Sequence, residues 1–253
     1  MSSVKKSVVV EASREIAFKV FTEKMALWWP ADHHIGKSHI AAIVLEPRPG
    51  GRWGELGADG KECQWGRVLA FEAPSRVVLA WQLDAKFEFD ASFETEVEIT
   101  FASEGDKKTR VTLEHKHLER FGEAEARMRE AFEAPDGWSL GLLRFGSAVS
   151  REGKQAFLLR LIPPRPTFAR DMTENERRVM MEHVVYWQGH TANNEVIAFG
   201  PVADPKNGGW GVSIVEVTDA ARVKRLTDED PVIMQNLGAH YEILPMPQVI
   251  LRR

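Results

Sequence analysis

A histidine and an aspartate in the C-terminal part of the chain are the residues best suited to acid–base chemistry. His183 lies in a stretch of helical periodicity, at the border between the stripe predicted to be buried and the surface. The buried stripe comprises Met180, Val184 and Trp187, and a neighbouring stripe carries Tyr186 and His190. A histidine held by a carboxylate through one ring nitrogen can exchange protons near neutral pH through the other nitrogen. Asp230, which Pro231 holds in an extended conformation, could supply that carboxylate.

This pair has two interpretations. It is either an acid–base site or a structural hydrogen bond that ties a helix to a sheet, and the residues by themselves favour the structural bond. The chain contains no Gly-x-Ser-x-Gly motif. Any reaction at His183 and Asp230 is therefore expected to be proton transfer, isomerisation or elimination rather than acyl transfer through a serine.

The other histidines and the one cysteine predict no metal site and no cofactor. The cluster His33, His34 and His39 matches no helical or hairpin ligand spacing, and its polar segment favours a solvated loop. Cys63 has no neighbouring pattern that would activate the thiol, and we expect it to be inert. His115 lies at an inward position near the end of a predicted strand. There it is either a hydrogen-bonded core residue or a polar contact inside a pocket.

Large aromatic side chains are concentrated in the first part of the chain. Six of the eight tryptophans lie within the first 153 residues, and the whole chain has only two tyrosines. An apolar cavity with few polar groups is the usual form of a small-molecule site, and a close-packed core is the alternative use of the same rings. The candidate ligand-binding residues are Trp53, Trp81, Phe87, Phe93, His115 and Trp138.

Composition excludes several classes of function. The chain has 253 residues, 43% hydrophobic and 28% charged, and its formal net charge of −4 belongs to the first 153 residues. Neither half is basic, so nucleic acid is not an expected partner. The longest apolar run is Ile40–Leu45, which is too short to cross a bilayer. The N-terminus also lacks the apolar core of a signal peptide, and we therefore expect a cytoplasmic protein without membrane contact.

Residues 1–153 are predicted to form one domain. Its expected elements are a strand at Lys5–Glu11, a helix capped by Ser13, a short helix at Met25–Trp29, strands within Ile40–His115, and helices at Glu123–Phe132 and Trp138–Val149. Strict alternation over Lys86–Thr100 predicts an antiparallel strand with one solvated side and an inward side that starts at Phe87. The length of this run predicts a bend or break near Asp90–Ser92.

Residues 154–253 are predicted to form a second domain, joined to the first at the polar segment Ser150–Lys154. Its expected elements are a strand at Ala156–Ile162, a helix opened by the capping box Thr173–Glu176, strands at Val196–Val202 and Trp210–Val217, a helix at Asp219–Leu226, and a last strand that begins with Tyr241–Leu244. This order is βαββαβ, the ferredoxin-like plan.

Several features of the first domain occur in a characteristic order. They are Ala12-Ser13 after the first strand, the pair Trp28-Trp29, the turn Pro49-Gly50-Gly51-Arg52-Trp53, the run Gly66-x-Val68-Leu69 with Pro74 and Trp81 after it, and Gly137-Trp138. In this order they resemble the START/SRPBCC superfamily, in the branch of homologues of the activator of the heat-shock protein 90 ATPase. The resemblance implies a helix-grip fold, in which a curved antiparallel sheet wraps around a long C-terminal helix. It also implies a cavity between them that often holds an apolar small molecule.

The second domain carries a separate resemblance. Its matching positions are Phe157-Leu158-Leu159, His183, Phe199-Gly200-Pro201 and Asp230-Pro231. They resemble the YCII-related family, which implies a ferredoxin-like domain of the dimeric α/β-barrel type that pairs through its sheet. In that family the residues that match His183 and Asp230 are the suspected active-site pair. Val232 stands where such families often carry an aromatic residue, so the substrate is not implied.

The sequence thus predicts an α+β fold, a helix-grip domain followed by a ferredoxin-like domain. The leading functional hypothesis is a homodimer whose first domain binds a small apolar or aromatic molecule, with a possible acid–base site at His183 and Asp230. The first alternative is an enzyme of the lyase or isomerase type centred on that pair, with the first domain as an accessory. The second alternative is a chaperone ATPase activator.

Overall fold

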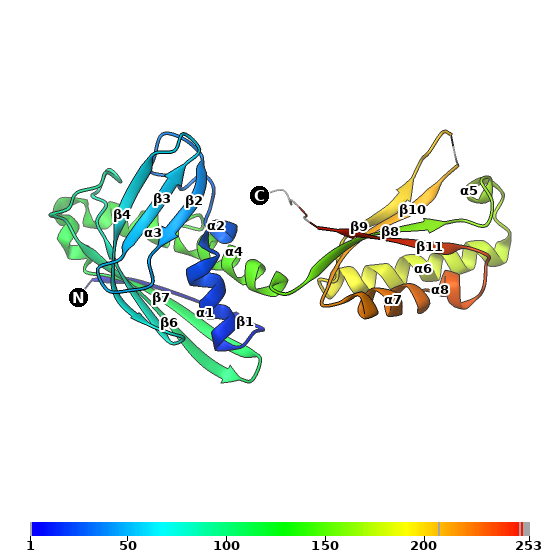
Figure 1. Ribbon diagram of the computed structural model, residues 1–253, viewed down its shortest axis with the longest axis horizontal. Coiled ribbons are helices and arrows are strands. Elements are labelled where there is room, and N and C mark those ends of the chain that lie inside the picture. The colour runs from blue at the N-terminus through cyan, green and yellow to red at the C-terminus, as the bar shows by residue number, and fades with distance from the viewer. Residues whose placement is uncertain (1, 207, 248, 250–253) are drawn as a thin grey trace. The chain divides into compact units, whose positions relative to one another are not determined.

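The computed structural model describes residues 2–206, 208–247 and 249 of the chain (Figure 1). Contacts between residues divide the chain into two units, Met1–Glu152 and Gly153–Arg253. Each unit has its own sheet and its own hydrophobic core. Gly153, at the start of the second unit, has a φ of 75°, a left-handed conformation that favours glycine.

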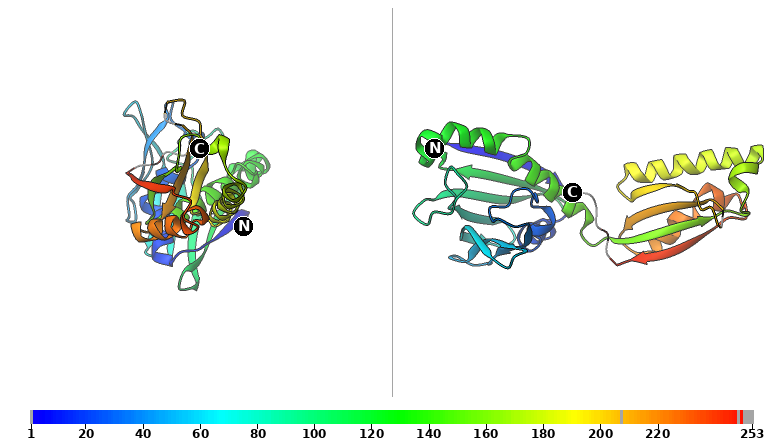
Figure 2. Two further views of the ribbon diagram at one scale, coloured as in Figure 1. Left: turned by 90° about the vertical axis from the view of Figure 1, so that its right-hand side faces the viewer. Right: turned by 90° about the horizontal axis from the view of Figure 1, so that it is seen from above.

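The first unit is a curved sheet with helices along one side. Its elements are β1 (Ser3–Val10), α1 (Arg14–Glu23), α2 (Met25–Trp28), β2 (Ile40–Leu45), β3 (Arg52–Gly57), β4 (Glu62–Glu72), β5 (Arg76–Trp81), β6 (Thr95–Gly105), β7 (Lys108–Lys116), a 3-10 helix at Leu118–Ala124, α3 (Glu125–Glu133) and α4 (Trp138–Arg151). The strands pair antiparallel in the order β1-β7-β6-β5-β4-β3-β2. Figure 2 shows α3 and α4, in green, along one side of this sheet. The predicted helix-grip architecture is confirmed.

Local signals place the helices of this unit. The Ser13 side chain accepts a hydrogen bond from the Ile16 backbone N–H at 3.4 Å, which caps α1 as predicted. Helix α2 ends at Trp28, two residues before Pro30. Helix α4 packs against β1, α1 and α2. Its buried stripe is Trp138, Gly141, Leu142, Phe145 and Val149. Helix α4 therefore supplies one wall of the core.

The strand predicted over Lys86–Thr100 was wrong in its first half, but the break predicted near Asp90–Ser92 is confirmed by the turn at Ala91 and Ser92. Strand β6 begins only at Thr95, and residues 84–94 form turns and a single antiparallel bridge from Phe89 to Leu83. The Asp84 carboxylate accepts hydrogen bonds from the backbone N–H groups of Lys86 and Glu88, and the Asp90 carboxylate accepts one from that of Ser92. Such local bonds compete with strand pairing. The predicted alternation holds from Thr95 onwards, where every second side chain to Phe101 is buried.

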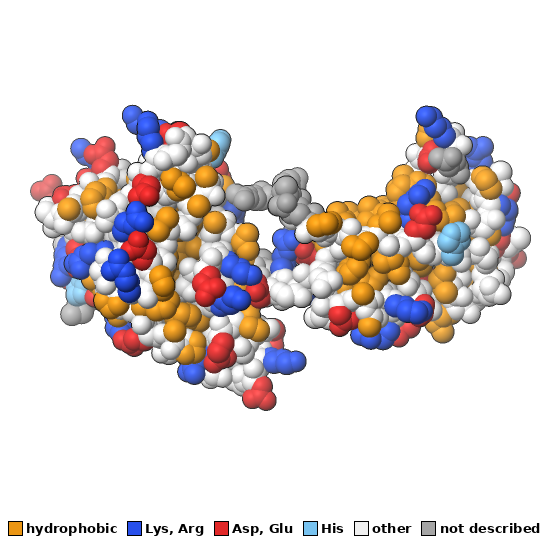
Figure 3. Space-filling view, in the orientation of Figure 1, with side chains coloured by type: hydrophobic (Ala, Val, Ile, Leu, Met, Phe, Trp, Pro, Cys, Tyr) orange, Lys and Arg blue, Asp and Glu red, His pale blue; other side chains and the backbone are white. Residues whose placement is uncertain are grey.

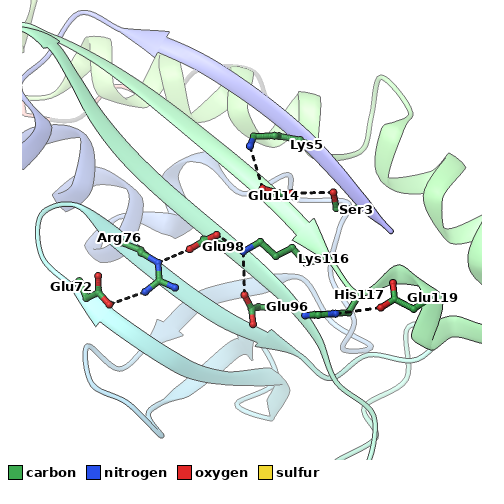
Figure 4. A network of polar contacts seen from close by, with 10 residues as sticks. All are labelled: Ser3, Lys5, Glu72, Arg76, Glu96, Glu98, Glu114, Lys116, His117 and Glu119. Carbon is green, nitrogen blue, oxygen red and sulfur yellow. Dashed lines mark hydrogen bonds and ion pairs between the residues drawn. The ribbon is translucent and has the colours of Figure 1, made fainter. Parts of the chain in front are cut away.

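The outer face of the same sheet carries charged side chains in pairs of opposite sign (Figure 4). Arg76 lies between Glu72 and Glu98, and Lys116 contacts both Glu98 and Glu96. These ion pairs join β4, β5, β6 and β7 across the face opposite the helices. Exposed pairs contribute little to stability, up to about 1 kcal/mol each. This face is therefore a solvated surface.

The second unit consists of one sheet with helices on a single face. Its elements are β8 (Gln155–Ile162), α5 (Phe168–Asp171), α6 (Glu174–Ala192), β9 (Val196–Val202), β10 (Trp210–Val217), α7 (Ala220–Asp228), α8 (Pro231–Met234) and β11 (His240–Met246). The strands pair antiparallel in the order β11-β8-β10-β9. The order of strands and helices predicted from the sequence is confirmed.

One face of this second sheet is covered and the other is not. Phe157 and Leu159 of β8 pack with residues of α6 and α7. Leu158 points to the opposite face, where its strand partners are Ile214 of β10 and Leu244 of β11. Hydrophobic side chains gather over these strands in Figure 3. The uncovered face is therefore apolar.

No helix in the part of the chain that the structure describes is long and apolar enough to cross a membrane.

Candidate functional site

The predicted histidine–aspartate pair forms in the second unit. The His183 Nδ1 atom of α6 lies 2.8 Å from Asp230 Oδ2 and 3.0 Å from Oδ1. Two further side chains donate to Oδ2, the Trp187 indole N–H at 2.8 Å and the Tyr241 hydroxyl at 2.5 Å. The Val232 backbone N–H donates to Oδ1 at 2.9 Å. One buried carboxylate thus connects α6, α8 and β11.

The sequence places Asp230 in this position through a helix cap. Asp230 is the N-cap residue of α8 with extended backbone angles, φ −62° and ψ 130°, and Pro231 occupies the first turn. Its side chain is fully buried. Burial raises the pKa of the carboxyl, but the hydrogen bonds from His183, Tyr241 and the Val232 N–H outweigh burial and hold this pKa below its ordinary value. Asp230 is therefore ionised at neutral pH.

The carboxylate fixes the tautomer of the histidine. An ionised carboxylate only accepts hydrogen bonds. Nδ1 of His183 therefore carries a proton and donates a hydrogen bond to Asp230. The Nε2 atom has no hydrogen-bond partner among the described residues. Burial and Asp230 raise the pKa of Tyr241, which keeps that hydroxyl protonated as a donor. The arrangement leaves one imidazole nitrogen available to accept a proton.

The buried stripe of α6 differs from the prediction. The buried residues are Val179, His183 and Trp187, whereas Val184 is 40% exposed and Met180 only partly buried. The helix is rotated so that His183 faces inward, because its bond to the buried Asp230 satisfies the imidazole there. Sequence reasoning did not identify Trp187 and Tyr241 as partners of Asp230. The available signal for Trp187 was its place one helical turn after His183.

A second candidate site is a cavity of ≈ 390 Å³ in the first unit. The described residues that line it are Trp29, Pro30, Asp32, His33, His34, Ile35, Trp65, Trp81, Leu83, Phe87, Ala131, Phe132, Ala134, Asp136, Gly137, Trp138 and Gly141. They come from the segment after α2, from β4, from β5 and the segment after it, and from the junction of α3 with α4. Trp29 and Trp65 stack with ring centroids 4.7 Å apart, and Trp81 meets Trp138 nearly edge-on at 75°. The walls therefore combine four tryptophans and two phenylalanines with smaller apolar residues.

The predicted ligand-binding residues divide into two groups. Trp81, Phe87 and Trp138 line the cavity. Trp53, Phe93 and His115 are not among its lining residues. Trp53 is 1% exposed and packs against Trp81, with ring centroids 5.8 Å apart. Phe93 packs against Phe121 of the 3-10 helix, with ring centroids 4.8 Å apart.

His115 supports the cavity wall from behind. It is fully buried, and this burial lowers its pKa to about 3, so the ring is neutral at neutral pH. The Trp138 indole N–H donates to Nδ1 at 3.3 Å, which leaves the proton of His115 on Nε2. Nε2 lies 2.8 Å from the Thr95 hydroxyl. The imidazole thus links α4 to β6 and orients the Trp138 ring that lines the cavity.

Three buried indole N–H groups, those of Trp53, Trp65 and Trp81, have no hydrogen-bond partner among the described residues. The rings of Trp53 and Trp65 meet at 89°, with centroids 5.6 Å apart. Trp81 also lies edge-on to Phe132 at 83°. In such edge-to-face contacts, an aromatic face can accept a weak hydrogen bond from N–H. These donors are therefore packed among aromatic rings, and two of the three, Trp65 and Trp81, line the cavity.

The segment that follows α2 brings polar groups to the mouth of the cavity. The Glu55 carboxylate of β3 is 2% exposed and accepts hydrogen bonds from the backbone N–H groups of Ile35, at 3.0 Å, and of Gly36. Gly36 allows this approach, because a Cβ there would lie 2.7 Å from Glu55 Oε1. Residues 31–39 form the loop that the sequence predicted, but Asp32, His33 and His34 line the cavity, which sequence reasoning missed. The available signal was Glu55, which stands two residues after Trp53 in β3. A charged residue there points inward like Trp53 and therefore needs a polar partner inside the unit.

These histidines do not form a metal site with their neighbours. The His34 Nδ1 atom lies 2.7 Å from the Gly36 carbonyl oxygen, which makes Nδ1 a donor. Within the residues that the structure describes, no group of three or more His, Cys, Asp or Glu side chains is placed to hold a metal ion.

Two family models match the chain. The model described as "Activator of Hsp90 ATPase homolog 1-like protein" matches residues 11–142, and the model described as "YCII-related domain" matches residues 156–247. No curated protein matches the chain.

Solved structures resemble the first unit. One is an anthrahydroquino-gamma-pyrone synthase at 36% identity, with 58% of this chain and 97% of that chain covered and a TM-score of 0.44. Another is the self-sacrificing resistance protein CalC from Micromonospora echinospora at 33% identity, with 59% of this chain and 95% of that chain covered and a TM-score of 0.48. The first family model extends over more than half of the sequence. The chain therefore belongs to the family of activator of Hsp90 ATPase homolog 1-like proteins, and its second half carries a YCII-related domain.

Proposed function

We propose that the first unit binds a small apolar or aromatic molecule in its cavity. The observation that carries this proposal is the lining of the ≈ 390 Å³ cavity, in which six of the described residues have aromatic rings. Concave sites of this volume with apolar walls and a few polar groups are typical of small-molecule binding. A planar ligand would exchange water contacts for ring contacts, which is favourable at about 25 cal/mol per Å² of apolar surface.

The cavity walls are held before any ligand arrives, which lowers the cost of binding. The Trp138 ring is fixed by its bond to His115. The Trp29 indole N–H donates to the His33 carbonyl oxygen at 3.1 Å, which fixes a second ring and the loop beside it. Glu55 holds the far end of that loop. These supports favour a preformed site over one that closes around its ligand.

The experiment that tests this proposal obstructs the mouth of the cavity. Ala131 of α3 is exposed and lines the cavity, whereas Ala126 on the same helix is exposed and is not among the lining residues. Isothermal titration with 1-naphthalenemethanol should show binding to the wild type and to Ala126→Trp. Affinity should fall about tenfold in Ala131→Trp, a loss of about 1.4 kcal/mol. Absence of binding to the wild type, or equal binding to both variants, would contradict the proposal.

We also propose an acid–base site in the second unit, centred on His183 and Asp230. The specific observation in its favour is the ionised, fully buried Asp230, which sets the tautomer of His183 and leaves Nε2 without a partner among the described residues. A histidine oriented in this way can remove a proton from a substrate and return it elsewhere. The reaction class that fits is proton transfer at carbon, as in an isomerase or a lyase. The structural hydrogen bond remains the competing role for the same pair.

We propose, third, that two copies of the chain pair through the uncovered face of the second sheet. The partner is a second copy because this face combines apolar residues with a charge pair that can match itself across a twofold axis. Arg160 on this face contacts Glu242 at 3.0 Å and lies over the Trp210 ring at 4.7 Å. Around them lie Leu158, Val212, Ile214 and Leu244, by the strand register. A partner sheet would remove these side chains from water.

A further inference from the structure

The polar side chains of the cavity in the first unit all carry acidic or imidazole groups. They are Asp32, His33, His34 and Asp136, and no lysine or arginine is among the described lining residues. Both aspartates are exposed, which places them at the mouth. Neither carboxylate has an ion pair or a hydrogen bond within the part of the chain that the structure describes. The mouth therefore bears two carboxylates without a direct ion pair among the described residues.

The unpaired aspartates contrast with the carboxylates on the outer face of the same unit. Glu98, for example, contacts both Arg76 and Lys116 there. Unpaired carboxylates beside a low-dielectric aromatic cavity concentrate a negative potential at its opening. A ligand that carries a positive charge would be attracted to this opening, and a ligand that carries a negative charge would be repelled.

The histidine at the mouth does not offset this potential at neutral pH. Burial is the largest influence on the pKa of His33 and lowers it. Asp136 and Asp32 raise this pKa, whereas Arg144 of α4 lowers it further. The net result is a pKa below the ordinary value. His33 is therefore mostly uncharged at and above neutral pH. Arg144, the one cation among these groups, is not a lining residue. No lysine or arginine of the described lining thus competes with a cationic ligand.

The tryptophan rings of the cavity also favour a cation over an anion. The face of a tryptophan ring attracts a cation within about 6 Å of its centre, and tryptophan does so better than tyrosine or phenylalanine. Trp29, Trp65, Trp81 and Trp138 line this cavity. Apolar burial and cation attraction would then act on two parts of one molecule.

We infer that the cavity is selective for an apolar amine in its protonated form, with the ammonium group beside Asp32 and Asp136 and the apolar body among the tryptophan rings. This inference rests on the proposed binding function of the same cavity and names its ligand class. It predicts a preference by charge among ligands of one shape.

Three naphthalene compounds of similar shape test the inference on the full chain. They are 1-naphthylmethylamine, which is a cation near neutral pH, 1-naphthalenemethanol, which is neutral, and 1-naphthoate, which is an anion. In isothermal titration the amine should bind about tenfold more tightly than the alcohol, and the naphthoate most weakly. The advantage of the amine should shrink as salt rises from about 50 to about 500 mM, because exposed charges are screened.

Matched substitutions assign the preference to the two aspartates. Asp32→Asn and Asp136→Asn should each weaken binding of the amine about threefold and leave binding of the alcohol unchanged. Asp106→Asn, at an exposed turn that is not among the lining residues, should change neither affinity. Circular dichroism of each variant confirms that it is folded.

The outcomes separate the inference from the function on which it rests. If the alcohol binds as tightly as the amine, or if both aspartate variants keep the preference of the wild type, the cavity binds aromatic molecules without selecting a cation and the inference is wrong. If none of the three compounds binds, the proposed binding function fails together with the inference.

Discussion

At the scale of single residues, the second unit depends on Asp230. Its carboxylate accepts hydrogen bonds from His183, Trp187, Tyr241 and the Val232 backbone. Removing one partner of such a buried charge typically destabilises a protein by about 3 to 5 kcal/mol. Stability alone therefore cannot distinguish a catalytic from a structural role for the pair. The test must read proton transfer directly.

Proton transfer by His183 can be measured as deuterium exchange at carbon. Wild-type protein in D₂O should accelerate exchange at the acidic C–H positions of at least one of cyclohexanone, pyruvate and γ-butyrolactone, followed by nuclear magnetic resonance. His183→Gln should reduce this rate about 100-fold, because an oriented general base contributes on that order. His190→Gln provides the control, since His190 lies on the same helix with its Nδ1 2.8 Å from Glu195. Equal rates in wild type and His183→Gln would leave the pair with a structural role only.

At the scale of elements, the sheet of the second unit has two different faces. Helix α6 begins with a capping box, in which the Thr173 hydroxyl accepts from the Glu176 N–H at 3.2 Å and the Glu176 carboxylate accepts from the Thr173 N–H at 2.7 Å. This helix covers one face of the sheet and leaves the Leu158 face open. Apolar side chains also lie on the outer side of α6, where Val185 is 66% exposed. The sheet face differs because its apolar side chains lie next to one another on three strands, with Leu158 paired to Ile214 and to Leu244.

The sheet face, and not the helix face, is expected to form the dimer. Leu158→Lys should convert the protein from dimer to monomer in size-exclusion chromatography with light scattering, because a buried lysine in each copy would lose its hydration at the interface. Val185→Lys makes the same chemical change on α6 and should leave the dimer intact. A wild type that is monomeric at about 100 μM, a concentration well above most specific dissociation constants, would contradict this pairing.

At the scale of the whole molecule, the chain consists of two units with separate cores. We expect residues 1–152 and 153–253, expressed separately, each to unfold in one cooperative transition, as domains of this size usually do. The two midpoints should reappear in the calorimetric trace of the full chain. If either segment alone gives no transition, the two units are not independent folding units. Membership of the family does not assign an activity to either unit, because folds of this kind host many functions.

The sequence by itself determined the order and type of most elements and the two family resemblances, and the second resemblance predicted His183 and Asp230 as a pair. Helical spacing, alternation, the Ser13 cap and the Asp230-Pro231 dipeptide are local signals, and each acts over a few residues. The same reasoning failed at residues 84–94, where Asp84 and Asp90 bind the nearby backbone and replace the strand that alternation predicts.

Only the tertiary structure decided which groups meet. Asp32 and Asp136 lie far apart in the sequence of the first unit, after α2 and before α4. They reach one cavity because α4 packs beside α2. Glu55 then holds the loop that carries Asp32. In the second unit, Tyr241 joins Asp230 through the position of β11 beside β8. Contacts between distant segments follow from packing of the whole core, and periodicity along the chain contains no information about them.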